Sequence, residues 1–157
     1  MAAFRIVAVG RRMPHWVAAG FDEYAKRLDG ALRLELVAVD AVSRRKGQST
    51  VQAMALEGQR LLAAAAGARP VALTRTGTAL TTPQLARRLE EWLMAGDPVA
   101  FLIGGADGLA PDCLEAAGLH WSLSPLTLPH MLVRIVLAEQ LYRAHSVLRG
   151  LPYHRGE

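Results

Sequence analysis

Short apolar runs alternate with longer amphipathic segments along the whole chain. The run Phe4–Val9 is apolar apart from one arginine and ends at Gly10. The run Val99–Ile103 is apolar throughout, which is typical of a strand buried on both faces of a parallel sheet. Residues 15–28 repeat apolar side chains at spacings of four, three and four, and this predicts an amphipathic helix.

The same pattern predicts five strands and five helices in alternation. Strands are expected at Phe4–Val9, Leu32–Val39, Pro70–Leu73, Val99–Ile103 and His120–Leu123. Helices are expected at His15–Leu28, Val51–Ala66, Pro83–Met94 with Thr82 as its cap, Pro111–Ala117 and His130–Leu148. The polar, basic stretch Ser43–Ser49 is expected to be a loop. Strict alternation predicts an α/β fold with a parallel sheet, and the 157 residues are expected to form a single domain, 1–157.

Composition excludes several classes of protein. Hydrophobic residues make up 52% of the chain and charged residues 20%, so a disordered chain is excluded. No run of 18 apolar residues occurs, so no membrane span is expected. The single cysteine, Cys113, excludes an internal disulfide and a multi-cysteine zinc site, and we expect no metal. With no signal peptide at the N-terminus, the sequence favours a cytoplasmic protein.

The basic charge has two interpretations. The net charge is +4 and the pI is about 9.8, and only Lys26 and Lys46 among the 18 basic residues are lysines. Because the guanidinium pairs bidentately with phosphates and stacks on bases, the arginines point modestly to a nucleic acid partner. A genomic bias toward arginine and alanine explains the composition equally well.

Three segments that follow predicted strands are candidates for chemistry: Leu73–Gly77, Gly104–Gly108 and Leu123–Leu128. Ligands in open α/β sheets bind beyond the carboxyl ends of the strands. The pair Gly104-Gly105 allows a close approach to the backbone, either by a ligand or within a tight turn. The segment 121–130 is apolar but interrupted by serines and prolines, so its backbone groups must be paired by the fold itself or by a ligand with an adenine edge.

Basic and aromatic residues gather near the C-terminus. Arg134, Tyr142, His145 and Arg149 recur near the helical repeat, as on a solvated helix face or a shared functional side. The tail Pro152–Arg155 combines an aromatic ring, an imidazole and a guanidinium where chains are usually frayed, which indicates a binding role.

Several motifs together resemble the RlmH family, the small SPOUT-class methyltransferases of the large ribosomal subunit. They span nearly the whole chain, and the C-terminal ones are the most specific. The motifs are Ala8-Val9-Gly10, Thr82-Pro83-Gln84-Leu85-Ala86, Phe101-Leu102-Ile103-Gly104-Gly105, Trp121-Ser122-Leu123-Ser124, Leu126-Thr127-Leu128-Pro129-His130, Val133-Arg134, Glu139-Gln140-Leu141-Tyr142-Arg143-Ala144 and Pro152-Tyr153-His154-Arg155.

This resemblance implies an α/β SPOUT fold with a C-terminal trefoil knot, a homodimer, and S-adenosylmethionine (SAM) as the methyl donor. The implied reaction is methylation of N3 of a pseudouridine in helix 69 of 23S ribosomal RNA on the assembled ribosome, with neither DNA nor a membrane as partner. Matched by position, the residues expected to bind SAM are Leu73, Gly104, Leu123, Ser124, Pro125, Leu126, Thr127 and Leu128.

Catalytic roles are assigned from chemistry. An imide such as pseudouridine N3–H needs no strong base, so a histidine or arginine that steadies its anion is sufficient. The candidates are His130, Arg143, Tyr153, His154 and Arg155. His130 begins the last helix, where the helix dipole favours an anion, although a plain helix cap is the alternative.

The chain departs from the family pattern at a few positions. Thr74-Arg75 stand where an acid is common, Ala106-Asp107 follow the glycine pair, His145 replaces an aromatic residue, and Gly156 is inserted before the last residue. Two other functions stay open. One is a SPOUT enzyme for transfer RNA or another ribosomal base. The other is a ribosome-binding protein without turnover, which would be expected to carry a spoiled cofactor loop; no charge interrupts Leu123–Leu128.

Overall fold

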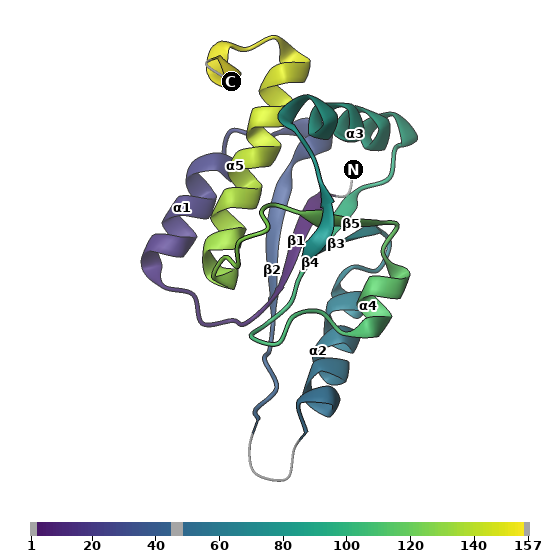
Figure 1. The fold of residues 1–157 in the computed structure, drawn as a ribbon. Coiled ribbons are helices and arrows are strands. Elements are labelled where there is room, and N and C mark those ends of the chain that lie inside the picture. The colour runs from purple at the N-terminus through teal and green to yellow at the C-terminus, as the bar shows by residue number, and fades with distance from the viewer. Residues whose placement is uncertain (1–2, 45–48, 156–157) are drawn as a thin grey trace.

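One sheet of five parallel strands forms the centre of the molecule (Figure 1). This computed structural model describes residues 3–44 and 49–155. The strand order is β2-β1-β4-β3-β5, and every strand pairs with its neighbours in parallel, so the predicted parallel α/β fold is confirmed. The strands are β1 (Phe4–Val9), β2 (Leu34–Val39), β3 (Arg69–Ala79), β4 (Val99–Ile103) and β5 (Leu119–Ser122).

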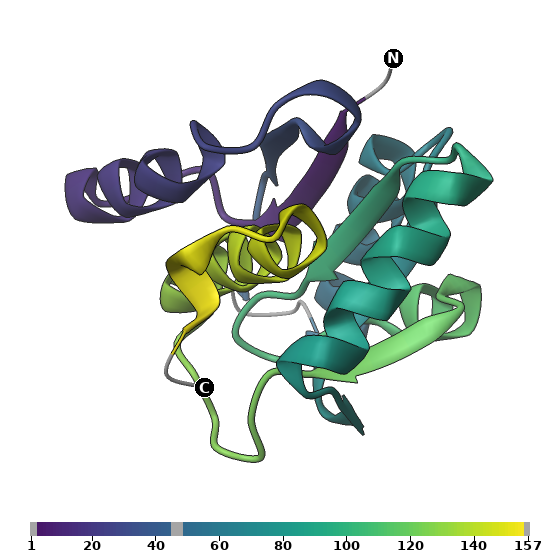
Figure 2. The ribbon, with the colours of Figure 1, turned by 90° about the horizontal axis from the view of Figure 1, so that it is seen from above.

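Helices cover both faces of the sheet (Figure 2). On one face lie α1 (His15–Ala25), α3 (Thr82–Ala95) and α5 (His130–Arg149). On the other lie α2 (Thr50–Ala64) and α4 (Pro111–Ala116). Two short 3₁₀ helices complete the described chain, η1 (Gly30–Leu32) and η2 (Pro152–His154). None of the helices in the described part of the chain is long and apolar enough to span a membrane.

The alternation of side chains along each strand creates two separate cores. In β1, Phe4, Ile6 and Ala8 pack into the core under α1, α3 and α5, while Val7 and Val9 pack under α2 and α4. In the larger core, the ring of Phe101 makes edge-to-face contacts with Trp92 at 5.8 Å and Trp121 at 6.0 Å between centroids. Each such pair adds about 1 kcal/mol to the burial of its rings.

The helix α5 is packed into the larger of the two cores. Leu137, Ala138, Leu141 and Ala144 are fully buried on it. It packs against α1 at Gly20, where a Cβ would lie 2.7 Å from Ile135 Cδ1, so the missing side chain lets the two helices approach. This packing fixes both ends of α5, and both ends carry residues singled out from the sequence.

Helix starts differ from the sequence prediction in one detail. Thr81, not Thr82, caps α3: its hydroxyl accepts from Gln84 N at 3.3 Å, and Gln84 Oε1 accepts from Thr81 N at 2.8 Å. Because this reciprocal capping box forms at Thr81, the helix begins one residue before Pro83, and Thr82 is its first residue rather than its cap. Ser49 caps α2 through the same pattern with Gln52.

Several element bounds were also predicted incorrectly. The second strand begins at Leu34 rather than at Leu32, because Leu32 belongs to the 3₁₀ helix η1. The first helix ends at Ala25 rather than at Leu28, because the hydrogen bonds beyond it become tighter turns: Arg27 N donates to Tyr24 O at 3.1 Å and Leu28 N to Ala25 O at 3.0 Å. The third strand runs to Ala79 rather than stopping at Leu73. Of the predicted loop Ser43–Ser49, residues 45–48 lie outside the described residues.

Candidate functional site

A cavity of about 650 Å³ lies at the carboxyl ends of β3, β4 and β5. Its wall comes mainly from three stretches of chain, residues 73–76, 103–109 and 123–133, and Leu114 of α4 adds to it. The size lies within the roughly 300–1,000 Å³ typical of small-molecule pockets. Its position is the one expected for ligands in an open α/β sheet. The three segments selected from the sequence therefore converge on one site.

Seven of the eight residues predicted to bind the cofactor line this cavity. They are Leu73, Gly104, Leu123, Ser124, Leu126, Thr127 and Leu128. The eighth, Pro125, is exposed within the same segment and is not part of the wall. The sequence did not indicate Leu109, Leu114 or Val133 as part of the wall: Leu109 and Leu114 belong to no motif, and Val133 belongs to a motif that implied no cofactor contact.

The stretch Leu73–Gly77 was predicted as a loop, but it lies within β3. Both Leu73 and Thr78 lie opposite Trp121 of β5, so the residues between them form an excursion from the strand ladder toward the cavity. Gly77 makes this possible, because a Cβ there would lie 2.5 Å from His120 O. The hydroxyl of Ser122 donates toward Arg75 O at 2.9 Å and Ser124 O at 3.0 Å, which ties two walls of the cavity together.

The sequence left two roles open for Gly104, a tight turn or a close approach by a ligand, and the structure shows the tight turn. A Cβ on Gly104 would lie 2.4 Å from Gly108 C and 2.8 Å from Leu109 N, so the approaching group is the chain's own backbone. Gly108 carries the left-handed φ of this loop, +85°, and its N–H donates to Gly105 O at 3.1 Å. Gly104 is therefore required by the turn.

The irregular segment after β5 supplies some of its own hydrogen bonds. Leu126 N donates to Ser124 Oγ at 2.9 Å, a serine turn of the kind that replaces regular structure. Leu126 itself is 73% exposed although it is apolar and lines the cavity. An exposed leucine at a cavity wall is available to cover a bound ligand.

His130 is the first residue of α5, and it lies in the cavity wall. It is not a helix cap, since the cap position is Pro129 and no side chain bonds there. Its Nδ1 is buried and has no hydrogen-bond partner among the described residues. Burial, and then the nearby charge of Arg134, lower the pKa of His130 below its ordinary value. The imidazole is therefore neutral at pH 7.

Arg134 lies one helical turn further along α5 and is fully buried. Its Nη2 donates to Val9 O at 3.0 Å and Gly10 O at 2.9 Å, and its Nη1 faces Met13 Sδ at 3.5 Å. The solvated helix face suggested by the spacing is wrong for this residue. The guanidinium instead ties the end of β1 to the start of α5, and burial lowers its pKa.

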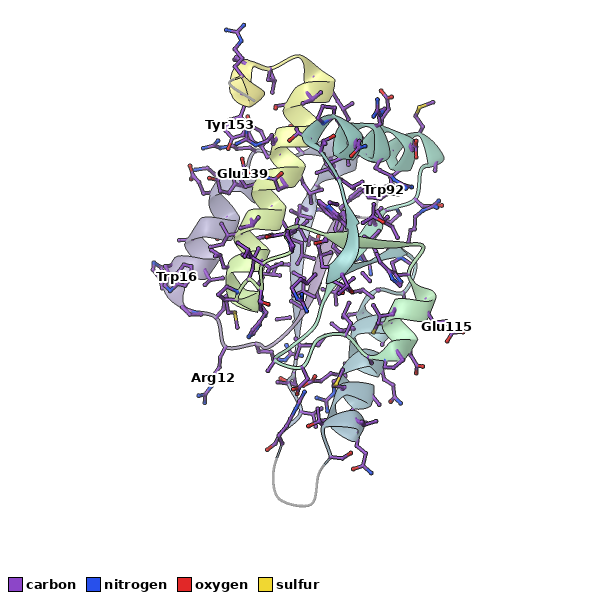
Figure 3. All side chains as sticks on the ribbon, in the orientation of Figure 1. Arg12, Trp16, Trp92, Glu115, Glu139 and Tyr153 are labelled. Carbon is purple, nitrogen blue, oxygen red and sulfur yellow. The ribbon has the colours of Figure 1, made fainter. Side chains whose placement is uncertain are left out.

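The C-terminal residues form a second cluster around Glu139 (Figure 3). Glu139 Oε2 accepts from Tyr153 Oη at 2.7 Å and from Arg143 Nη2 at 2.8 Å. Tyr153 packs edge-on against Tyr142 at 4.7 Å, and the Arg143 guanidinium lies 5.0 Å from the Tyr153 ring centroid. Burial and the bond to Glu139 raise the pKa of Tyr153 to about 12. The tail is thus docked on α5 through Tyr153.

Comparison with known proteins identifies the family. Residues 2–154 match the family model described as a predicted SPOUT methyltransferase. The chain belongs to this family. It is 54% identical over 151 residues to a protein of Alkalilimnicola ehrlichii named ribosomal RNA large subunit methyltransferase H, covering 96% of this chain and 97% of that protein. A protein of the same name from Xanthomonas campestris is 50% identical over 152 residues, with the same coverage.

Solved structures agree on the fold. A probable methylase family protein from Haemophilus influenzae superimposes with a TM-score of 0.56 at 14% identity, covering 96% of this chain and 69% of that one. A tRNA (m1G37) methyltransferase from Aquifex aeolicus gives 0.55 at 12% identity, with coverage of 99% and 73%. The resemblance stated from the sequence motifs is confirmed, and the SPOUT fold implies the expected C-terminal trefoil knot.

In this SPOUT methyltransferase, α5 separates the predicted catalytic residues into two groups. His130 lies at the cavity, whereas Arg143 lies 13 residues further along α5, about 20 Å away along the helix axis. Tyr153 lies beside Arg143 at that far end (Figure 3), and Arg155 is exposed. The side chain of His154 is outside the described residues. One chain therefore does not bring these residues together at its own cavity.

Metal chemistry has no candidate site in the described part of the chain. No group of three or more histidine, cysteine, aspartate or glutamate side chains lies together there. Cys113 is buried between α2 and α4, with its thiol directed toward Gly58 O at 3.6 Å. The chemistry open to the site is that of a neutral histidine, a helix N-terminus and a cavity rich in backbone groups.

Proposed function

We propose that this protein transfers the methyl group of SAM to N3 of a pseudouridine in helix 69 of 23S ribosomal RNA, on the assembled ribosome in the cytoplasm. The observation that carries the proposal is the convergence of the three strand-following segments on one cavity. The names of relatives at 50–54% identity support ribosomal RNA of the large subunit as the substrate. We take residues 1–157 as one SPOUT domain that carries the cavity.

The residues of the cavity fit SAM. Leucines from three segments, Leu73, Leu109 and Leu128, offer apolar contacts for an adenine ring, while the irregular stretch 123–128 places backbone groups at the cavity for its polar edge. The buried Nδ1 of His130 is an unpartnered polar atom at the same wall. The predicted binding residues, Pro125 excepted, thus form a cradle of the right chemical kind.

Bound SAM supplies a methyl group already activated by its positive sulfur. The protein's own task is to orient the acceptor nitrogen in line with that group and to manage one proton. N3–H of pseudouridine is an imide and is more acidic than an amine. His130, neutral at pH 7, accepts this proton directly or through water, and the N-terminus of α5 favours the negative charge that develops on the ring.

A second copy of the chain completes the site in this proposal. Arg143, Tyr153, His154 and Arg155 lie far from the cavity of their own chain, so they act on the cavity of a partner in a homodimer. Leu132, Ile135 and Val136 of α5 are only half-buried, which leaves apolar surface for such a contact. The tail then supplies stacking and charge to the flipped-out base.

The direct experiment is methyl transfer from labelled SAM. We expect label to enter ribosomes that lack the modification, with the label mapping to N3 of a pseudouridine in helix 69. Label in transfer RNA or at another ribosomal base would replace the proposed substrate. Ribosome binding without any transfer would indicate a protein that binds and does not turn over.

A further inference from the structure

An ion-pair network joins α2 to the glycine loop of the cavity. Its centre is Glu57 of α2, a glutamate with only 3% of its surface exposed. Glu57 Oε2 accepts from Val42 N at 2.9 Å and from Arg44 Nη1, and Oε1 accepts from Arg44 Nη2 at 3.1 Å. The guanidinium thus pairs with the carboxylate by two parallel bonds, the strongest geometry for such a pair.

The other edge of the same guanidinium holds Asp107. Arg44 Nε and Nη2 lie 3.1 Å and 3.0 Å from Asp107 Oδ2. Asp107 belongs to the loop 104–108 that lines the cavity, and it lies 63 residues from Arg44 in sequence. The loop also rests directly on the network, since a Cβ on Gly105 would lie 3.6 Å from Glu57 Oε1. One arginine therefore connects a buried anchor to a cavity wall.

The two carboxylates that Arg44 joins differ in burial, since Glu57 is buried and Asp107 is exposed. Burial alone would raise the pKa of Glu57, but the bonds from Arg44 and Val42 outweigh it and leave the pKa below its usual value. Glu57 is thus a fixed, charged anchor. Asp107 is far more exposed, with 37% of its side chain in solvent, and its neighbours Ala106 and Gly108 are exposed as well. The base of the loop is packed at Gly104 and Leu109, but its tip, residues 106–108, is exposed, so the link from Asp107 to Arg44 matters for the shape of the tip.

We propose that Arg44 is a positioning residue that holds the glycine loop in its cavity-lining conformation, with Glu57 as the anchor and Asp107 as the point of attachment. The proposal rests on the proposed function only in taking SAM as the ligand of that cavity. Arg44 itself is not part of the cavity wall. Its effect on the ligand must therefore pass through the loop, and Asp107 is the loop residue to which it bonds directly.

A double-mutant cycle that measures the Kd for SAM tests whether Arg44 acts on the ligand through Asp107. Asp107→Asn should raise the Kd for SAM about tenfold, and Arg44→Met should raise it at least as much. The double variant should bind no more weakly than Arg44→Met alone, because both changes break the same link. Arg11→Met is the control: it breaks the exposed Arg11–Asp40 pair at 2.7 Å, neither residue of which lines the cavity, and should leave the Kd unchanged.

Two further readouts separate positioning from damage to the fold. Arg44→Met leaves Glu57 buried without its partner and is expected to lower stability, whereas Asp107→Asn should leave the urea midpoint close to that of the wild type. Hydrogen exchange at the amides of residues 105–109 should be about tenfold faster in Asp107→Asn and unchanged in Arg11→Met.

Additive effects on the Kd would overturn the proposal, because Asp107 would then act on the ligand by itself. An unchanged Kd in Asp107→Asn, with unchanged exchange, would also overturn it. If the wild-type protein binds no SAM, the proposed function fails, and hydrogen exchange alone then decides whether Arg44 holds the loop.

Discussion

At the scale of single residues, Gly104 shapes one wall of the cavity. We predict that Gly104→Ala deforms the loop, because its Cβ would lie 2.4 Å from Gly108 C. SAM affinity, measured by calorimetry, should fall at least about tenfold, with a loss of about 1–3 kcal/mol in the free energy of unfolding. Gly118→Ala is the control, since nothing lies within 4 Å of its Cβ position. Equal behaviour of the two variants would contradict this reading of the turn.

His130 and His145 give the protein a pH-dependent stability. Burial, followed by a nearby arginine, lowers the pKa of each in the folded chain, while the unfolded chain keeps values near 6.5. The unfolded state therefore binds more protons at low pH, and the free energy of unfolding should fall as the pH drops below about 6.5 toward the folded pKa values.

Urea denaturation at pH 7.5 and 5.5 measures this effect. The wild type should lose more stability between the two values than the variant carrying His130→Gln and His145→Gln, since the carboxylates contribute equally to both proteins. The same loss in both proteins would show that neither histidine resists protonation in the folded state.

Buried arginine is the residue type that the sequence signals least well. Spacing suggested that Arg134 lies on a solvated face, yet it is fully buried and bonds to the carbonyls at the end of β1. Helical periodicity shows which residues share a face. It does not show that an arginine on that face can be buried when carbonyl oxygens accept hydrogen bonds from its guanidinium. The role of Arg44 was hidden for a similar reason, because its two carboxylates come from distant segments.

At the scale of elements, α5 and the tail belong together. Tyr153 docks on Glu139, Tyr142 and Arg143, so the tail is held in place before any partner arrives. Deleting residues 152–157 should leave the fold intact with a loss of about 1–2 kcal/mol, mainly from the Tyr153 bond to a carboxylate. Methyl transfer should fall at least about a hundredfold, because one oriented transition-state contact contributes about 3 kcal/mol.

Tyr153→Phe measures how much the single bond from Tyr153 to Glu139 contributes to holding the tail on α5. It keeps the ring and removes the bond to Glu139, so denaturation should show a smaller loss than the deletion. Full activity in the deleted chain would remove the tail from the mechanism altogether.

The elements themselves were largely predictable because their hydrophobic patterns are strong. All five strands and five helices occur in the predicted order, and β1 and β4 match to the residue. The extension of β3 was not predictable, since Gly77 normally ends a strand pattern and here permits the close approach of β5. Likewise, Leu109 and Leu114 enter the cavity wall only through the way α4 packs.

At the scale of the whole molecule, each proposed site needs two chains. Sedimentation should show a homodimer at micromolar concentration, and a 17 kDa monomer would contradict this. A mixture of the tail-deleted chain with the Gly104→Ala chain should regain activity in its heterodimers, because one cavity and one tail remain intact across one interface. Heterodimers that stay inactive would show that the tail does not act on the partner.

The central claim is that the cavity at the carboxyl ends of β3, β4 and β5 holds SAM. Mapping of backbone amide shifts during a titration with SAM tests it most directly. The account predicts the largest shifts at residues 73–76, 103–109 and 123–130, with saturation at one SAM for each cavity. Shifts concentrated elsewhere in the chain, with these three segments unmoved, would contradict it.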